Sequence, residues 1–316
     1  MKKVLINYNM FCEDFVELKD KYAVTFPEEH CFDFEKLLEI IPEYDALSCL
    51  YNFPVTKKLI DRATRLKIIA NFASGYDNID VDYALKKGLT ITNTPNAGID
   101  STANLALALI FATARRITEC ERKLRSNKEI KTLETLGMHV TGQTLGILGL
   151  GRIGKALCKR AQACGMNVIY HNRHQLTSDE EIKLEVKYVS FEELLTESDY
   201  LSLNAPLTRE TYHIIKEKEI KKMKPTAILI NTARGLLVDE FALAEALKKR
   251  TIYGAGLDVF ASGNIPIKEL LNLENVVLTP HIGVQTWHSR IEMAKTVSNN
   301  IIGYFENDRP IFKITC

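Results

Sequence analysis

Gly149-Leu150-Gly151-Arg152-Ile153-Gly154 is the stretch that decides the fold of this chain. The apolar run 144–148 before it indicates a buried strand, the pattern over 155–164 indicates a helix, and a second strand is expected at 167–170. A Gly-x-Gly-x-x-Gly loop in such a unit is the turn with which parallel sheets hold a dinucleotide. Its first glycine permits the tight turn, the second lets backbone approach a pyrophosphate, and the third lets helix and strand pack closely. The loop therefore predicts a dinucleotide at the positive N-terminus of the helix, the alternative being a glycine-rich turn without a ligand.

The residues after the second strand bear on which dinucleotide is bound. An acidic residue usually stands there and accepts hydrogen bonds from the adenosine ribose, whereas this chain has Asn172 and Arg173. A carboxylate would repel a 2′-phosphate, while an amide and a guanidinium can bind one. The sequence thus predicts NADP(H) in preference to NAD(H). The alternative is that Arg173 is only a surface charge surrounded by water.

Length and composition favour a two-domain globular protein. The chain has 316 residues, of which 46% are hydrophobic and 26% charged, and single cores rarely grow to that length. A net charge of +1 provides no basic surface for nucleic acid or for an anionic membrane. Seven scattered cysteines, an odd number, are typical of reduced thiols, so we expect a cytoplasmic protein.

Strands and helices alternate along the whole chain. The N-terminal third has apolar runs at 4–6, 46–50, 67–71 and 89–93, with helical patterns at 34–40 and 54–63 between them. A second series after the glycine loop adds strands at 200–203, 227–231, 254–258 and 275–278. This alternation predicts an α/β fold with parallel, doubly wound sheets. The helical pattern over 287–304 would then carry the chain back to the first domain.

Residues 101–125 have the pattern of one long helix, apolar on nearly all sides from Ala103 to Ala114. Such a helix is buried between two layers or between two subunits. This favours a homodimer, although a helix that joins two domains would have the same composition. The segment 127–141 after it is polar and less regular, and we expect a loop there.

Three polar side chains come at the ends of predicted strands in the second series. They are Arg234, Asp258 and His281. Open α/β sheets place their ligands at the carboxyl ends of strands, and arginine is rarely buried unless it is paired. A buried arginine, aspartate and histidine at adjacent strand ends therefore favour a functional site over a structural role.

Six segments carry a resemblance to a known family. They are 75–80 (Gly-Tyr-Asp-Asn-Ile-Asp), 92–95 (Thr-Asn-Thr-Pro), 203–208 (Leu-Asn-Ala-Pro-Leu-Thr), 231–235, 256–260 and 278–283. With these motifs the chain closely resembles the D-isomer-specific 2-hydroxyacid dehydrogenases, and within them the glyoxylate/hydroxypyruvate reductases. The resemblance implies hydride transfer between NAD(P) and a small 2-oxo acid or D-2-hydroxy acid. It also implies a Rossmann coenzyme domain, 99–286, inserted in a flavodoxin-like parallel α/β substrate domain, 1–98 plus 287–316, and homodimers built on the coenzyme domains.

By position, the resemblance implies a role for each site residue. Arg234 would clamp the substrate's carboxylate and carbonyl oxygen, and His281 would be the general acid that protonates that oxygen. Backbone N–H groups around Ser74 and Gly75 would hold the carboxylate, and Asp258 would accept a hydrogen bond from the nicotinamide carboxamide. The other implied cofactor contacts are Thr102, Ala205, Pro206, Thr208, Thr232 and Gly283. We expect no metal site.

The chain departs from the family at one catalytic position. Gly263 stands where the family has the glutamate that partners its histidine, and no acidic residue follows until Glu269. Without that carboxylate, His281 should be a weaker acid and base near neutral pH. Three hypotheses follow: a slow or more acid-dependent enzyme, a carboxylate supplied from elsewhere, or a dinucleotide-binding sensor that no longer catalyses. Val284 and Gln285 also depart from the family, which commonly has a small hydroxyl residue and alanine there.

Overall fold

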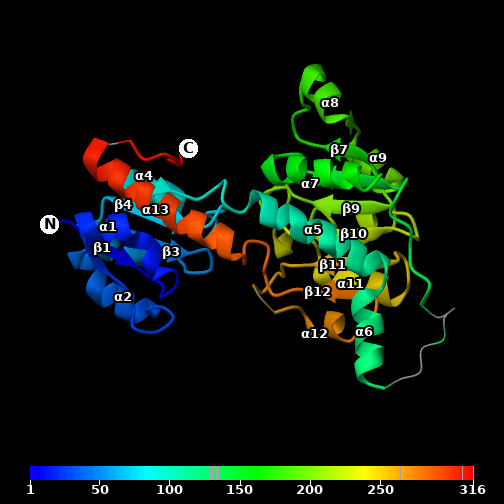
Figure 1. Cartoon of the computed structure of the whole chain (residues 1–316), viewed down its shortest axis with the longest axis horizontal. Helices are drawn as coiled ribbons and strands as arrows, with labels where there is room; N and C mark the ends of the chain where they lie inside the picture. Colours follow the sequence, from blue (N-terminus) through cyan, green and yellow to red (C-terminus); the bar gives the residue numbers. More distant parts are fainter. Residues whose placement is uncertain (128–130, 132–134, 264, 308, 316) are drawn as a thin grey trace. The chain divides into compact units, whose positions relative to one another are not determined.

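The computed structural model describes residues 1–127, 131, 135–263, 265–307 and 309–315 (Figure 1). The chain divides into two compact units. Unit 1 comprises Met1–Gly98 and Val284–Cys316, and unit 2 comprises Ile99–Gly283. Each unit is built on a sheet of its own.

Unit 1 has a five-stranded sheet in the order β2-β1-β3-β4-β5, with every neighbouring pair parallel. The strands are β1 (Lys3–Ile6), β2 (Ala23–Thr25), β3 (Ala46–Leu50), β4 (Ile68–Phe72) and β5 (Thr90–Thr92). Successive side chains point to opposite faces, so Leu5 belongs to one apolar core while Val4 and Ile6 belong to another. This strand order is that of flavodoxin-like sheets.

Helices cover both faces of the unit 1 sheet. On the face of Leu5 lie α2 (Phe34–Ile40), α3 (Lys57–Arg62) and α4 (Val81–Lys86), with the 3-10 turn η2 (Ile41–Glu43). On the opposite face lie η1 (Cys12–Phe15), α1 (Val16–Lys21) and the long α13 (Trp287–Asn307). The C-terminal helix packs there through Met293, Ala294 and Val297, which are buried against β1 and β4. The carboxyl end of β4 is thus next to the start of α13.

Unit 2 has a seven-stranded parallel sheet in the order β12-β11-β10-β9-β6-β7-β8. Its strands are β6 (Thr144–Leu148), β7 (Asn167–His171), β8 (Lys187–Tyr188), β9 (Tyr200–Leu203), β10 (Ile228–Asn231), β11 (Gly254–Leu257) and β12 (Val276–Leu278). The order runs outward from β6 in both directions, so the switch point of a Rossmann sheet lies between β6 and β9. The predicted α/β class, with a Rossmann sheet and a flavodoxin-like sheet, is confirmed.

Two layers of helices enclose this sheet. One layer is α5 (Ile99–Ala114) and α7 (Arg152–Ala163). The other is α9 (Phe191–Glu197), α10 (Glu217–Ile220), α11 (Glu240–Lys248) and α12 (Lys268–Leu271), with the turn η4 (Gly235–Leu237). The remaining helices are α6 (Ile117–Arg125) and α8 (Ser178–Leu184). None of the helices that the structure describes is long and apolar enough to cross a membrane.

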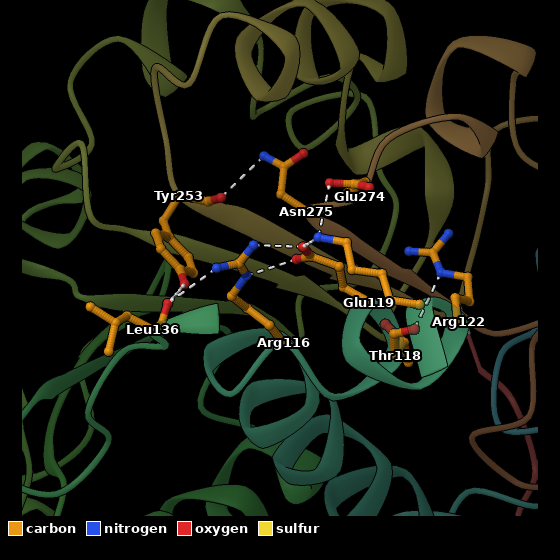
Figure 2. A network of polar contacts seen from close by, with 9 residues as sticks. Arg116, Thr118, Glu119, Arg122, Leu136, Tyr253, Glu274 and Asn275 are labelled. Atoms are coloured by element: carbon orange, nitrogen blue, oxygen red, sulfur yellow. Dashed lines mark hydrogen bonds and ion pairs between the residues drawn. The ribbon is translucent and has the colours of Figure 1, made fainter. Parts of the chain in front are cut away.

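The prediction of one helix over 101–125 is wrong, because two helices occupy that segment. α5 ends at Ala114, and Arg116 takes a left-handed conformation with φ 55° before α6 begins. The Arg116 guanidinium binds both carboxylate oxygens of Glu119, at 2.7 Å from Nε and 2.5 Å from Nη2, and Lys123 Nζ binds the same carboxylate at 2.6 Å (Figure 2). These charge-assisted bonds offset the cost of the left-handed residue. No glycine or proline marks the break in the sequence.

The apolar half of the predicted helix is buried within unit 2. α5 packs against α7 on one side and against β10 and β11 on the other. Its buried side chains include Ala103, Ala106 and Ile110. Burial between two layers therefore accounts for its composition. Of the loop predicted over 127–141, residues 128–130 and 132–134 lie outside the described residues.

Candidate functional site

The glycine loop makes a tight turn between β6 and α7. Gly149 has φ 97°, which side chains rarely adopt, and a Cβ there would lie 2.7 Å from the backbone nitrogen of Ala205. A Cβ on Gly154 would lie 2.6 Å from the carbonyl oxygen of Gly149. At Gly151, by contrast, no other described atom lies within 4 Å of the Cβ position. Two of the glycines are needed for packing, and the third leaves the open space that an approaching phosphate requires.

The start of α7 leaves backbone donors for an anion. Leu150 N–H is already used, since it donates to Asn172 Oδ1 at 2.6 Å. The N–H groups of Gly151, Arg152 and Ile153 donate to no acceptor in the part of the chain that the structure describes. Free N–H groups at the positive end of a helix bind phosphate. The loop therefore fits the pyrophosphate of a dinucleotide.

Two buried polar atoms at neighbouring strand ends have no partner among the described residues. They are Oδ1 of Asn204, the residue that follows β9, and Oγ1 of Thr232, the residue that follows β10. Buried polar atoms without a hydrogen bond are rare, so both atoms fit contacts to a bound cofactor. Ala205, Pro206 and Thr208, the other cofactor residues expected here, occupy the loop directly after Asn204.

Asn172 and Arg173 directly follow β7, the strand next to β6. Because Oδ1 of Asn172 accepts from the glycine loop, its amide nitrogen is left as a donor. Arg173 is exposed. The pKa of the Glu210 carboxyl is lowered. The largest cause is a hydrogen bond from the Thr208 side chain, followed by a hydrogen bond from the backbone of Glu210 itself, and the charges of Arg173 and Arg209 act in the same direction. Two guanidinium groups therefore lie in this region, where the adenosine end of a dinucleotide would bind.

Asp258 holds the turn that carries His281. Its buried carboxylate accepts hydrogen bonds from Thr279 Oγ1 at 2.6 Å, from Ile282 N at 2.8 Å and from Gly283 N at 2.9 Å. Its backbone carbonyl accepts from His281 N at 2.9 Å, and His281 has a left-handed φ of 57°. Burial raises the pKa of the Asp258 carboxyl, and the three hydrogen bonds offset part of that rise. These bonds fix a strained residue in place, as is common at functional sites.

Asp258 also brings cofactor residues together. A Cβ on Gly283 would lie 3.2 Å from Asp258 Oδ2 and 3.3 Å from Thr102 Oγ1, so all three residues expected to contact the cofactor meet. Because both carboxylate oxygens already accept bonds from the His281 turn, Asp258 acts first as a positioning residue. A contact to the nicotinamide carboxamide stays a prediction.

Arg234 lies on a loop that follows β10 and crosses the end of the next strand. A Cβ on Gly235 would lie 2.0 Å from the carbonyl carbon of Phe260, so only glycine allows the two backbones to approach so closely. Asn231 Nδ2 donates to the carbonyl of Arg234 at 2.9 Å, and Arg234 Nη1 donates to the carbonyl of Ala233 at 2.8 Å. The loop is thus held by its own residues.

Burial of the three strand-end residues differs from the prediction. Asp258 is buried, as expected, whereas Arg234 and His281 are partly exposed. The prediction of a buried arginine and histidine is therefore wrong. Their positions after the ends of their strands place them beyond the core, which leaves them accessible to a ligand.

Ser74 and Gly75 follow β4 in unit 1 and form a turn whose carbonyl groups accept hydrogen bonds from asparagine side chains. Asn93 Nδ2 donates to the carbonyl of Ser74 at 2.6 Å, and Asn71 Nδ2 donates to that of Gly75 at 2.8 Å. The N–H groups of Ser74 and Gly75 have no acceptor among the described residues. Consecutive free N–H groups form a concavity that binds anions. The turn therefore fits a carboxylate.

The loop that lacks the family's glutamate is closed by a hydrogen bond from Gly263 N to Phe260 O at 3.2 Å. Gly263 has φ 99° and no other described atom within 4 Å of its Cβ position. A carboxylate reaches this loop from another element, because buried Glu240 at the start of α11 accepts a hydrogen bond from the N–H of Ala261. Its second oxygen has no partner among the described residues. The sequence does not single out Glu240, since an acidic residue in the first turn of a helix is ordinary.

Comparison with known proteins assigns the chain to a family. The sequence profile of the D-isomer specific 2-hydroxyacid dehydrogenase, NAD binding domain, matches residues 107–283. The chain belongs to this family. A glyoxylate reductase of Thermococcus litoralis is 50% identical over 280 residues, which cover 87% of this chain and 84% of that protein.

Solved structures agree with the sequence comparison. A glyoxylate reductase from Paecilomyes thermophila matches with a TM-score of 0.91 at 35% identity, covering 99% of this chain and 98% of that one. An NADPH-dependent glyoxylate/hydroxypyruvate reductase from Sinorhizobium meliloti, in complex with NADP and malonate, matches with a TM-score of 0.87 at 27% identity, covering 99% and 97%. The resemblance drawn from the motifs is confirmed, and this 2-hydroxyacid dehydrogenase is an NAD(P)-dependent oxidoreductase. The relatives give no support to the non-catalytic alternative.

Proposed function

We propose that this dehydrogenase reduces glyoxylate, hydroxypyruvate and related small 2-oxo acids to D-2-hydroxy acids. The observation that carries the proposal is the carboxyl edge of the unit 2 sheet. The free N–H groups of the glycine loop, the Arg234 loop and the His281 turn all follow strand ends there. Two similar proteins are named glyoxylate reductase, and this supports the same substrate class.

Arg234 and His281 supply the chemistry in this proposal. A bound nicotinamide dinucleotide supplies the hydride. The Arg234 guanidinium binds the substrate's carboxylate and carbonyl oxygen, with the carboxylate also held by the N–H groups of Ser74 and Gly75. As C2 is reduced, negative charge develops on the carbonyl oxygen, and protonated His281 gives its proton to that oxygen. In the reverse direction, neutral His281 takes the proton from the hydroxyl group.

Gly263 stands where the family has the glutamate that partners its catalytic histidine. We therefore expect turnover to be slower, and to fall off at lower pH, than in a relative that has the glutamate. The positioning bonds of Asp258 keep the His281 turn in place in its absence.

Assays with a panel of 2-oxo acids test the proposal. We expect NADPH oxidation with glyoxylate and hydroxypyruvate between about pH 5 and 8, the range in which histidine titrates. His281→Asn should lower kcat by about 10²- to 10⁴-fold with little change in cofactor affinity, and His288→Asn, an exposed histidine of unit 1, is the matched control. If no acid of the panel is turned over at any pH, the proposal is contradicted.

We also propose that NADP(H) is preferred over NAD(H). The amide nitrogen left free on Asn172, together with Arg173 and the nearby Arg209, supports this choice, since no carboxylate follows β7 to repel a 2′-phosphate. Arg173→Ala should raise the KM for NADPH by about tenfold and that for NADH far less. Arg209→Ala measures whether the second guanidinium contributes. Equal effects of Arg173→Ala on both cofactors would mean that the arginine does not contact the 2′-phosphate.

A homodimer built on unit 2 is our proposal for the assembly. Apolar side chains of α6 and of the segment after it are exposed, with 53% of Ile117, 66% of Leu124 and 66% of Leu136 accessible. The Arg116–Glu119 ion pair joins the residue before α6 to the first turn of that helix (Figure 2). Light scattering should give the mass of a dimer, and Leu124→Glu should shift it toward the monomer. A monomeric wild-type protein would contradict the proposal.

A cytoplasmic location is the remaining proposal. The six cysteines in the described ranges form no disulfide, and Cys316 lies outside those ranges. Burial raises the pKa of the Cys49 thiol to about 12 and that of Cys158 to about 11, so both stay protonated and unreactive. Free thiols are typical of a reducing compartment. Cell fractionation should recover the protein with cytoplasmic markers, and recovery from the medium would contradict this.

A further inference from the structure

Arg290 is a buried cation without an anionic partner. It lies in the first turns of α13, with only 2% of its surface exposed. The groups in contact with it are neutral: Gln285 Oε1 accepts from Nε at 3.1 Å, Met293 Sδ lies 3.9 Å from Nη1, and the ring of Phe72 lies 5.4 Å from the guanidinium. No carboxylate of the described residues lies within 4.0 Å of it. The N–H groups of Nη2 therefore have no acceptor in the described chain.

The packing of Arg290 does not by itself account for a buried charge. A guanidinium that is removed from water loses its hydration. The contact with an aromatic ring, one hydrogen bond to an amide oxygen and a contact with a thioether sulfur compensate for that loss only in part. Desolvation accordingly lowers the pKa of Arg290, while the hydroxyl groups of Tyr51 and Tyr8 act in the opposite direction. Buried charges are ordinarily paired. An anion or a strongly polar oxygen from a ligand would complete this environment.

The position of Arg290 in the sheet indicates which ligand. Its guanidinium lies over Phe72, the last residue of β4, and the Ser74–Gly75 turn with its free N–H groups follows directly. Both features belong to the carboxyl edge of the unit 1 sheet, the edge at which open α/β sheets bind ligands. In the proposed function, the Ser74–Gly75 turn and Arg234 already take the C1 carboxylate and the C2 carbonyl oxygen. The next substituent of a 2-oxo acid is on C3.

We propose that Arg290 binds substrate and selects 2-oxo acids that carry an oxygen on C3, as a hydroxyl or a carboxylate. This rests on the proposed function and adds the substrate group that the enzyme prefers. Glyoxylate has no C3, and the methyl group of pyruvate offers no acceptor, whereas hydroxypyruvate and oxomalonate do. A guanidinium presents its donors in a fixed fork that suits such oxygens. Gln285, which stands where the family commonly has alanine, binds Nε, and Met293 Sδ lies against Nη1, so the N–H groups of Nη2 are left for the substrate.

Four substrates of graded chemistry test the assignment: glyoxylate, pyruvate, hydroxypyruvate and oxomalonate. In Arg290→Met we expect kcat/KM for hydroxypyruvate and oxomalonate to fall by about 10- to 100-fold, the effect of a lost charged hydrogen bond. The values for glyoxylate and pyruvate should fall by about threefold or less. Arg290→Lys should recover part of the loss, and Gln285→Ala should change the substrate ratio in the same direction by a smaller factor.

A matched control separates binding from packing. Arg65→Met removes an exposed arginine of the same unit, which pairs with Asp45 at 3.2 Å, and it should leave the substrate ratio as in the wild type. Equal losses for all four substrates in Arg290→Met, accompanied by a lower Tm, would overturn the proposal and assign Arg290 a packing role.

A binding measurement keeps this proposal separate from the proposed function. With NADPH present, oxomalonate should raise the Tm of the wild type more than that of Arg290→Met, whether or not the acid is turned over. An equal rise in both proteins contradicts the role of Arg290. Absence of turnover with every one of the four acids in the wild type contradicts only the proposed function.

Discussion

The two sheets of this dehydrogenase end in turns that offer free N–H groups, but the groups are freed in different ways. In unit 2 they belong to Gly151, Arg152 and Ile153, which start α7 and so have no helical acceptor. In unit 1 they belong to Ser74 and Gly75, whose carbonyl groups are held by asparagine side chains. A helix N-terminus suits a diffuse, doubly charged phosphate group, while a short turn suits a small carboxylate.

The difference shows which sites can be recognised locally. The phosphate turn depends on three glycines at fixed spacing, because Gly149 and Gly154 pack against neighbouring backbone and Gly151 leaves room for the ligand. The carboxylate turn depends in part on Asn93, which lies 19 residues along the chain from Ser74. The local pattern therefore predicts the phosphate turn by itself, whereas the carboxylate turn could be proposed only through the resemblance to the family.

The largest effect is expected from breaking the turn of unit 2. Gly149→Ala places a methyl group against the backbone of Ala205 at a φ of 97°, so we expect it to weaken NADPH binding by about 100-fold or more and to lower the Tm. Gly151→Ala has no neighbour to disturb. It should keep a Tm within about 2 °C of the wild type yet bind NADPH about tenfold more weakly, because the methyl group takes the space of the phosphate.

Thermal unfolding without cofactor and nucleotide fluorescence titration measure the two quantities. Normal NADPH affinity in Gly151→Ala would show that the open side of the loop does not face the pyrophosphate. The steric interpretation of the loop would then be lost, although the fold would stand.

A second glycine of positive φ sharpens the comparison. Gly263 has φ 99°, but no other described atom surrounds its Cβ position, so the packing does not demand a glycine there. Gly263→Glu restores the carboxylate of the family, and Gly263→Ala carries the same backbone strain, about 1 kcal/mol, without the charge. We expect kcat for glyoxylate to be about tenfold higher in Gly263→Glu than in Gly263→Ala.

The pH profile of the same pair is the more specific measurement. A carboxylate beside His281 stabilises its protonated form, so the fall of kcat/KM with rising pH should move to higher pH in Gly263→Glu. Identical profiles in the two variants would indicate that the loop does not bring residue 263 to the histidine, and Glu240 would then be the carboxylate to replace.

Elements with a strong internal pattern could be predicted from the sequence. The apolar runs at 144–148 and 200–203 coincide with β6 and β9, because a buried parallel strand is apolar on both faces. The edge strands β2 and β8 were outside the prediction, since two or three partly exposed residues carry no period. The break between α5 and α6 was also missed, because it depends on the Arg116–Glu119 contact and not on a helix-breaking residue.

The residues of the candidate site likewise divide into those with a local sequence pattern and those that depend on contacts between distant residues. Arg234, His281 and the glycine loop could be proposed because each follows a strand in a short motif. Glu240 and the role of Arg290 could not, because they rest on contacts across the fold: a hydrogen bond to Ala261 in one case and the absence of a carboxylate in the other.

A smaller effect is expected from the turn of unit 1. Asn93→Ala removes the hydrogen bond to the carbonyl of Ser74 and leaves the turn held by Asn71, so we expect the KM for glyoxylate to rise by about fivefold, the worth of one hydrogen bond. The Kd for NADPH should stay within about twofold, because the cofactor contacts proposed here belong to unit 2. A KM unchanged by the substitution would show that the free N–H groups of Ser74 and Gly75 do not hold the substrate.

The smallest kinetic effect is expected at Glu119, which lies in unit 2 but not at the carboxyl edge of its sheet. Burial raises the pKa of this carboxyl, yet hydrogen bonds from Arg116 and Lys123 more than offset that and hold the pKa below its usual range (Figure 2). A carboxyl whose pKa is lowered in the folded state adds stability above its unfolded pKa, about 4.3 for glutamate, and that stability is lost as the pH falls through the folded value.

Glu119→Gln should therefore cost about 2 kcal/mol at pH 7, with a difference in Tm that shrinks below about pH 4, while NADPH affinity stays as in the wild type. A Tm difference that is the same at pH 3 and pH 7 would assign the cost to lost packing, and a change in NADPH affinity would show that the α5–α6 break reaches the cofactor turn.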